Sequence, residues 1–100
     1  MKKKSYYVYI LLTQRQTLYC GYTDDVLKRF RKHKIGKGAK YTRSYKPVKL
    51  VYVQKFSSRK EAMKEEYRLK QLSKTQKWTL IKKQRFSLLK IILYFSSRFL

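Results

Sequence analysis

Residues 6–22 read YYVYILLTQRQTLYCGY, and this stretch decides the fold. Two runs rich in aromatic and β-branched residues, Tyr6 to Leu12 and Leu18 to Tyr22, flank the polar segment TQRQ at residues 13–16. Such runs are typical of β-strands, and the short polar connection predicts an antiparallel hairpin.

Period-two alternation assigns the side chains of this hairpin to faces. It puts Tyr7, Tyr9 and Leu11 on one face of the first strand, and Tyr19 and Gly21 on one face of the second. The register is not readable from the sequence, so the pattern leaves open whether Tyr9 and Tyr19 share a face. Each tyrosine alone would most simply be a half-buried sheet residue.

A helix follows the hairpin. Thr23, Asp24 and Asp25 are good N-cap and first-turn residues, and the pattern predicts a helix over Val26 to Lys34 that ends at Gly36. Its expected apolar stripe is Val26, Leu27 and Phe30.

Arg29 and His33 fall together along one border of that stripe. They lie one turn apart, so both side chains can reach the same phosphate. A lone histidine among lysines and arginines would otherwise be a solvated surface residue.

Residues 36–43, GKGAKYTR, form a basic segment that we interpret as a loop. Glycine lets backbone N–H groups approach an anion closely, and the basic side chains can neutralise phosphates. The candidate nucleic-acid contacts are Gly21, Lys37, Lys40, Tyr41 and Arg43. A flexible, solvated connection is the alternative. Pro47 and a third strand over Val48 to Phe56 follow.

The capping-box pattern SRKE at residues 58–61 predicts a second helix that begins near Arg59. Its expected apolar stripe is Ala62, Met63, Leu69 and Leu72. Glu66 lies within this stripe, whereas Glu65 points elsewhere. A carboxylate on an inward face costs desolvation energy unless a cation or strong donors meet it. A metal ion and a neighbouring lysine or arginine are both candidate partners.

A further helical segment is expected from Lys74 to Ile81, with Trp78 and Ile81 closing the core. The expected class is α+β, with a small three-stranded antiparallel sheet flanked by helices. We divide the chain into a domain over residues 6–81 and a basic and apolar extension over residues 82–100. The extension is too interrupted for a membrane span. It could pack on the domain, form a dimer contact or touch a membrane surface.

Composition points to a polyanionic partner. The chain has 27 Lys and Arg against 5 Asp and Glu, a net charge of +22 over 100 residues. Such a charge favours nucleic acid, although a membrane-surface protein would share it. The single cysteine, Cys20, excludes an internal disulfide and is compatible with a reducing cytoplasm. No secretory signal is expected, because the first lysines precede a strand-like run.

The tripeptides at residues 7–9 and 19–21, YVY and YCG, make the chain resemble the GIY-YIG nuclease family. Tyr7 replaces the first glycine and Cys20 an aliphatic residue, but both family tyrosines, Tyr9 and Tyr19, are kept.

The resemblance extends to the helices. Arg29 and His33 have the spacing after Gly21 that the family uses for its catalytic Arg and its His or Tyr, and Glu66 precedes Leu69-Lys70 as the family's metal-binding Glu does. The segment at 36–43 narrows the resemblance to small, stand-alone bacterial members.

This resemblance implies a metal-dependent endonuclease. Tyr9, Tyr19, Arg29, His33 and Glu66 would be the catalytic residues, and Glu66 would hold Mg²⁺ or Mn²⁺. The metal would stabilise the leaving oxygen, and Arg29 would hold the scissile phosphate. One of the two tyrosines would help to deprotonate the attacking water. His33 would position that water or the tyrosine, or accept a proton itself.

The expected partner is nucleic acid, with DNA favoured over RNA and little sequence specificity. A structure-specific role in DNA repair or processing would suit such an enzyme. No organic cofactor and no membrane partner are expected, and the oligomeric state is monomer or dimer. The alternatives are a non-catalytic nucleic-acid-binding module on the same fold and a membrane-associated or scaffold protein driven by the C-terminal run.

Overall fold

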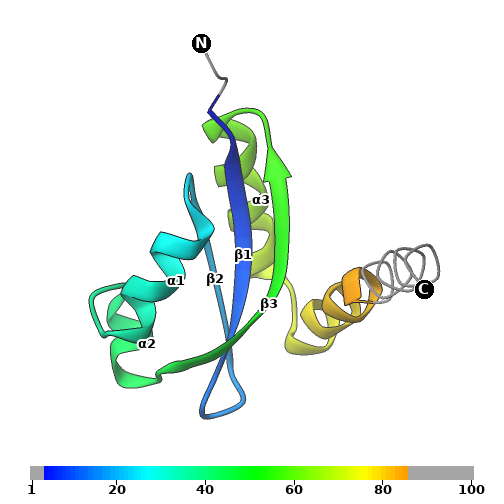
Figure 1. The fold of residues 1–100 in the computed structure, drawn as a ribbon. Helices are drawn as coiled ribbons and strands as arrows, with labels where there is room; N and C mark the ends of the chain where they lie inside the picture. The colour runs from blue at the N-terminus through cyan, green and yellow to red at the C-terminus, as the bar shows by residue number, and fades with distance from the viewer. Residues whose placement is uncertain (1–3, 86–100) are drawn as a thin grey trace, which may run out of the picture.

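The computed structural model describes residues 4–85, which form a three-stranded antiparallel sheet flanked by helices (Figure 1). The strands are β1 (Tyr6–Thr13), β2 (Leu18–Thr23) and β3 (Pro47–Phe56). Their order in the sheet is β2-β1-β3, so β1 is the central strand. The α+β class and the antiparallel hairpin predicted from the sequence are confirmed.

The strand register answers the question that the sequence left open. Tyr9 pairs with Gly21, and Leu11 pairs with Tyr19, across the β1 and β2 ladder. Residues that pair across antiparallel strands project from the same face of a sheet. Tyr9 and Tyr19 therefore share one face.

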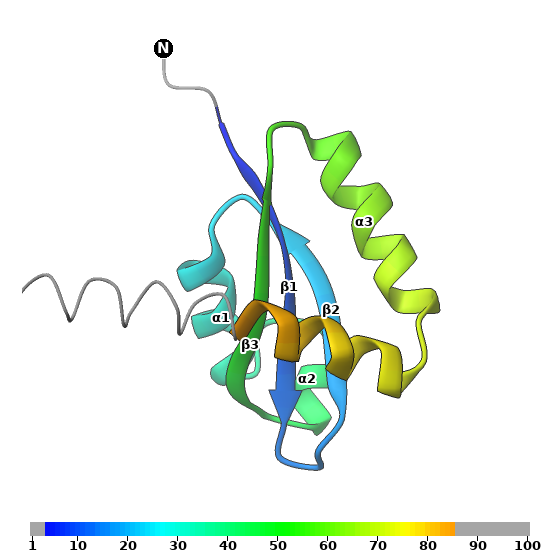
Figure 2. The same ribbon diagram turned by 90° about the vertical axis from the view of Figure 1, so that its right-hand side faces the viewer.

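The helices are α1 (Val26–Lys34), α2 (Lys40–Ser44) and α3 (Arg59–Gln71), followed by a helical segment over residues 74–85. Figure 2 shows that α1 and α2 lie on one side of the sheet, while the 74–85 segment crosses the other side. In the same view α3 runs beside β2. The sheet is thus covered on both faces.

Local signals set the helix ends as predicted. The Asp25 carboxylate accepts a hydrogen bond from the Lys28 amide at 3.1 Å, and the Ser58 hydroxyl accepts one from the Glu61 amide at 3.1 Å. Gly36 follows the C-cap of α1 with a φ of +80°, a conformation that glycine adopts without steric cost. The N-cap and C-terminal patterns therefore fix α1 to its predicted bounds.

The hydrophobic core lies between the sheet and the face formed by α3 and the 74–85 segment. It contains the buried side chains of Val8, Ile10, Cys20, Val51, Tyr52, Ala62, Leu69 and Ile81. Trp78 and Leu72 pack against this cluster, as the sequence predicted. Burial raises the pKa of the Cys20 thiol, so this cysteine acts as a small core residue.

Two expectations about helix faces are wrong. Leu27 is 66% exposed and Met63 is 47% exposed, although both were placed in apolar stripes. In α1 the buried residue is His33, because this helix covers a polar face of the sheet rather than the core.

The predicted loop over residues 36–43 is also partly wrong, since α2 begins at Lys40. This helix is only five residues long, too short to leave a periodic signal in the sequence. Residues 82–85 continue the last helical segment, and the rest of the predicted extension lies outside the described residues. Among residues 4–85, no helix has the length and apolarity to cross a membrane.

Candidate active site

Three aromatic rings from three elements meet on the sheet face that α1 and α2 cover. The rings of Tyr9 and Tyr19 have centroids 6.4 Å apart. The His33 ring lies 5.8 Å from that of Tyr9 and 5.1 Å from that of Tyr19, with edge contacts to both. The structure therefore brings together three of the predicted catalytic residues.

A chain of hydrogen bonds fixes the His33 ring. The Tyr9 hydroxyl lies 2.8 Å from His33 Nε2, and Thr42 Oγ1 lies 2.6 Å from His33 Nδ1. The Thr42 hydroxyl donates to the Ala39 carbonyl at 3.0 Å, so its proton is not available to His33. We infer that Nδ1–H donates to Thr42 and that Nε2 accepts the Tyr9 proton.

Burial governs the ionisation of this pair. Desolvation and the positive charge of Arg29 lower the pKa of His33 to about 4. Desolvation raises the pKa of Tyr9 to about 12, against the effect of the adjacent Arg29 guanidinium. At neutral pH the Tyr9–His33 pair is therefore uncharged, with the proton on the tyrosine oxygen.

Arg29 brings a fixed positive charge to the two phenols. The adjacent Tyr9 hydroxyl, with a smaller effect from Tyr19, raises the pKa of Arg29. This arginine is only partly buried, whereas His33 is 0% exposed. His33 therefore contacts the Tyr9 hydroxyl rather than solvent, while part of the Arg29 side chain is open to solvent.

Two glycines make room for these rings. A Cβ atom at Gly21 would lie 2.5 Å from the Tyr9 hydroxyl oxygen, because the two residues pair across the sheet. A Cβ atom at Gly38 would overlap the His33 ring. Gly21 is buried beneath Tyr9, and its lack of a side chain leaves space for that ring.

Glu66 stands at the border of the site on α3. Its carboxylate is 20% exposed, and Oε1 lies 3.7 Å from Lys70 Nζ. Desolvation is the main cause of the raised pKa of Tyr9, and the negative charge of Glu66 adds a smaller effect. Glu65 is similarly buried, but Arg68 holds it with a 2.6 Å hydrogen bond.

The donor set fits one type of metal site. No group of three or more His, Cys, Asp or Glu side chains gathers in the part of the chain that the structure describes. Glu66 is a partly exposed carboxylate with only a long contact to Lys70. One such carboxylate suits Mg²⁺, which retains several waters and is completed by phosphate oxygens.

The predicted nucleic-acid residues lie around α2. Tyr41 is 37% exposed and stacks on Tyr19, with centroids 6.0 Å apart and an 18° angle between the planes. Lys37, Lys40 and Arg43 are exposed on or next to this helix. The series of ring contacts continues to Tyr45. Its ring lies 5.0 Å from that of Tyr41 and 5.0 Å from the Arg15 guanidinium.

Sequence reasoning missed Thr42, Tyr45 and Arg15. The only local signal for Thr42 is its residue type. Threonine hydroxyls often bond to a backbone carbonyl three positions earlier in a turn, as Thr42 does with Ala39.

Comparisons with known proteins find matches over most of this chain. The family model of the GIY-YIG catalytic domain matches residues 5–80. A UPF0213 protein of Bacillus velezensis is 45% identical over 87 residues, covering 87% of this chain and 88% of the relative. A UPF0213 protein of Oceanobacillus iheyensis is 49% identical over 81 residues, covering 81% and 94%. The solution NMR structure of a protein from E. faecalis has 37% identity and a TM-score of 0.54, covering 87% and 91% of the two chains.

Proposed function

Because the chain belongs to the GIY-YIG family, we propose that it is a divalent-metal-dependent endonuclease that hydrolyses nucleic-acid phosphodiester bonds. DNA is the favoured substrate, and a role in DNA repair or processing in the bacterial cytoplasm would suit it. The observation that carries the proposal is the convergence of Tyr9, Tyr19 and His33 on one sheet face with Arg29 beside both phenols.

Arg29 would bind the scissile phosphate. It is the charged side chain next to both phenols, and its planar fork of donors matches the oxygens of a phosphate. As the phosphorus becomes five-coordinate, the same guanidinium would offset the growing negative charge. Glu66 would hold Mg²⁺ or Mn²⁺, which supplies Lewis-acid stabilisation of the leaving oxygen when bound.

Tyr19 is the better candidate to receive the proton of the attacking water. Tyr9 is 2% exposed and donates to His33, so water has little access to its oxygen. Tyr19 is partly exposed, so water can reach its oxygen, and it lies next to the Arg29 guanidinium. Tyr19 would first lose its own proton to solvent; the water oxygen would then bond to phosphorus as its proton passes to the Tyr19 oxygen, and the bond to the leaving oxygen would break, that oxygen taking a proton from solvent.

Tyr9, His33 and Thr42 would then act as positioning residues. Their hydrogen bonds run from the centre of the sheet to α2 and hold the ring against which Tyr19 packs. A site held in this way loses little energy to reorganisation during the reaction.

The test is cleavage of labelled duplex, single-stranded, flapped and branched DNA, and of RNA, with Mg²⁺ or Mn²⁺ and with a chelator. We expect cleavage that requires metal and falls by about 100-fold or more in Glu66→Gln and Arg29→Ala. Glu65→Gln is the matched control, since it removes a carboxylate of similar burial one position away. Equal activity in Glu66→Gln and Glu65→Gln would remove Glu66 from the mechanism.

Binding without cleavage on every substrate would identify the alternative, a non-catalytic nucleic-acid-binding module. Either function predicts that affinity falls steeply with salt, because phosphate contacts release counterions. A shallow salt dependence would count against nucleic acid as the ligand.

A further inference from the structure

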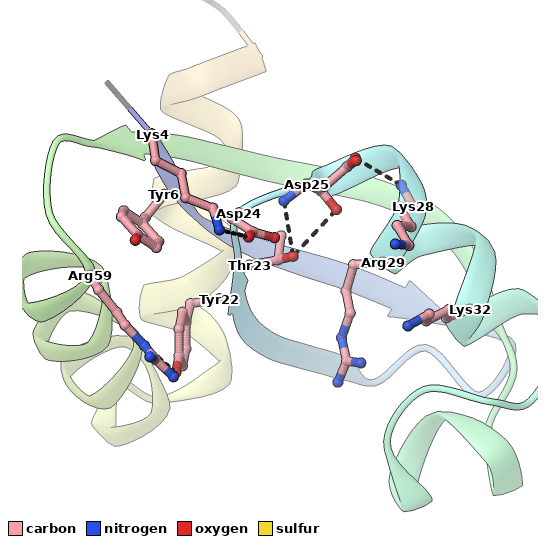
Figure 3. Close-up of a pocket in the computed structure, with 10 residues that line it drawn as sticks. All are labelled: Lys4, Tyr6, Tyr22, Thr23, Asp24, Asp25, Lys28, Arg29, Lys32 and Arg59. Atoms are coloured by element: carbon pink, nitrogen blue, oxygen red, sulfur yellow. Dashed lines mark hydrogen bonds and ion pairs between the residues drawn. The ribbon is translucent and has the colours of Figure 1, made fainter. Parts of the chain in front are cut away.

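A second concave surface adjoins the site and shares Arg29 with it. This pocket has a volume of about 500 Å³ and lies where the end of β2 leads into α1 (Figure 3). Arg29 and Lys32 line it from α1, and Arg59 lines it from the start of α3. Its volume falls within the range of small-ligand sites, about 300–1,000 Å³. A group bound here would therefore lie next to a phosphate held by Arg29.

The charges in the pocket favour an anion even though two carboxylates line it. Asp24 forms an ion pair with Lys4 at 2.8 Å, and Asp25 accepts the Lys28 amide as the N-cap of α1. Both acidic groups are thus engaged within the protein. Among residues 4–85, Lys32 and Arg59 form no ion pair with a carboxylate. Five basic residues and two acidic residues line the pocket, so the formal charge of its lining is positive.

One wall of the pocket is aromatic. The Tyr22 hydroxyl accepts hydrogen bonds from Arg59 Nε and Nη2 at 3.4 Å and 3.3 Å, and Tyr6 also lines the pocket. In Figure 3 the Tyr22 and Arg59 side chains lie against each other across the pocket from Arg29. Aromatic rings beside cationic groups are the usual receptors for unpaired bases and their phosphates.

We propose that this pocket binds one unpaired nucleotide adjacent to the cleaved bond. The inference rests on the proposed function, and it names the substrate class as strands with an unpaired nucleotide, such as flaps, branches and single strands. In a duplex each base is paired and stacked, so a whole base can enter a pocket only after it leaves the stack, whereas an unpaired base is free to do so. Arg59 and Lys32 line opposite sides of the pocket (Figure 3), so they would neutralise the phosphates on either side of the bound nucleotide.

The test compares two double variants with the same loss of charge. Lys32→Gln with Arg59→Gln alters the pocket, whereas Arg31→Gln with Lys60→Gln alters the neighbouring residues on the same two helices, which do not line it. All four side chains are exposed, so both proteins are expected to fold, and a thermal melt checks this. Fluorescence anisotropy in chelator then measures binding of a labelled single strand, a flapped duplex and a fully paired duplex.

We expect the pocket variant to bind the single strand and the flap about tenfold more weakly than the control variant, while the two bind the duplex equally. Equal losses in both variants would overturn the proposal, since net charge alone would then explain them. A pocket-specific loss that is as large for the duplex would also overturn it, because unpaired nucleotides would not be selected.

The binding measurement also separates this inference from the proposed function. Metal-dependent cleavage by the wild type together with equal binding by the two variants would reject only the pocket. A pocket-specific loss of single-strand binding in a protein that cleaves nothing would reject only the nuclease.

Discussion

Alternate residues of β1 build two regions with opposite chemistry. Val8 and Ile10 project into a core closed by Leu69 and Ile81, where apolar atoms meet apolar atoms. Tyr9, between them, projects to the other face and ends in a buried hydrogen-bond chain. Both faces are well buried, and yet only one of them has an apolar interior.

The difference is in what each face can tolerate. The core depends on volume and shape, so it accepts apolar substitutions of similar size. The site face depends on the pairing of each polar group, and no buried side-chain N or O atom between residues 4 and 85 lacks a partner. Substitutions on the core face should therefore lower stability through lost volume, and substitutions on the site face through unpaired polar groups.

The largest effect is expected in the core. Ile10→Ala should lower the free energy of unfolding by about 2–5 kcal/mol, because it removes buried methyl groups and leaves a cavity. Urea denaturation followed by circular dichroism measures the change. Tyr9→Phe, one residue away, keeps the ring volume and should cost clearly less. A larger loss for Tyr9→Phe would mean that the hydrogen bonds rather than the core dominate stability.

The pH dependence of stability isolates the polar face. His33 has a pKa of about 4 when folded against 6.5 in a model peptide, so the unfolded chain binds a proton between these values and the folded chain does not. Above pH 6.5 the imidazole is neutral in both the folded and the unfolded chain, so its burial does not make stability depend on pH. Stability should fall as the pH drops from 6.5 to about 4, by on the order of 3 kcal/mol in total.

His33→Gln is the control for this slope, because it removes the only histidine in the chain. Its free energy of unfolding should change little between pH 6.5 and pH 5, above the range where carboxylates titrate. Parallel curves for the two proteins in that window would show that His33 is not buried in its neutral form.

Gly21 tests how tightly the site face is packed. Gly21→Ala should lower the free energy of unfolding by up to about 3 kcal/mol, since its Cβ would lie 2.5 Å from the Tyr9 hydroxyl oxygen. Gly36→Ala is the comparison, because its cost of about 1 kcal/mol arises from a positive φ alone. Only Gly21→Ala should also disturb the NMR signals of the Tyr9 ring.

Sequence patterns predicted most of the fold because they act locally. Alternation separated Tyr9 from Ile10, and the caps at Asp25 and Ser58 set the helix starts. Periodicity failed at Leu27, since it assumes that a buried helix face is apolar, and α1 instead buries His33 against a tyrosine.

The sequence predicted which residues belong to the site, but not how they are arranged. The family spacing selected Tyr9, Tyr19 and His33, and the structure brings these three rings together. Their arrangement required the β1 and β2 register and the position of α2, neither of which leaves a local signal. For that reason the burial of His33 and the contact with Thr42 were not foreseen.

Thr42 gives the smallest and sharpest test of the polar face. Thr42→Val keeps the volume of the side chain but leaves the His33 Nδ1–H without an acceptor, at a cost of about 1–2 kcal/mol. The ring would then favour the Nε2–H tautomer, and its hydrogen bond with Tyr9 would reverse direction. Imidazole ¹⁵N chemical shifts distinguish the two tautomers, and a thermal melt checks that the variant remains folded. Thr42→Ser keeps the hydroxyl and should retain the wild-type shifts, so a change in both variants would show that Thr42 acts through packing rather than through its oxygen.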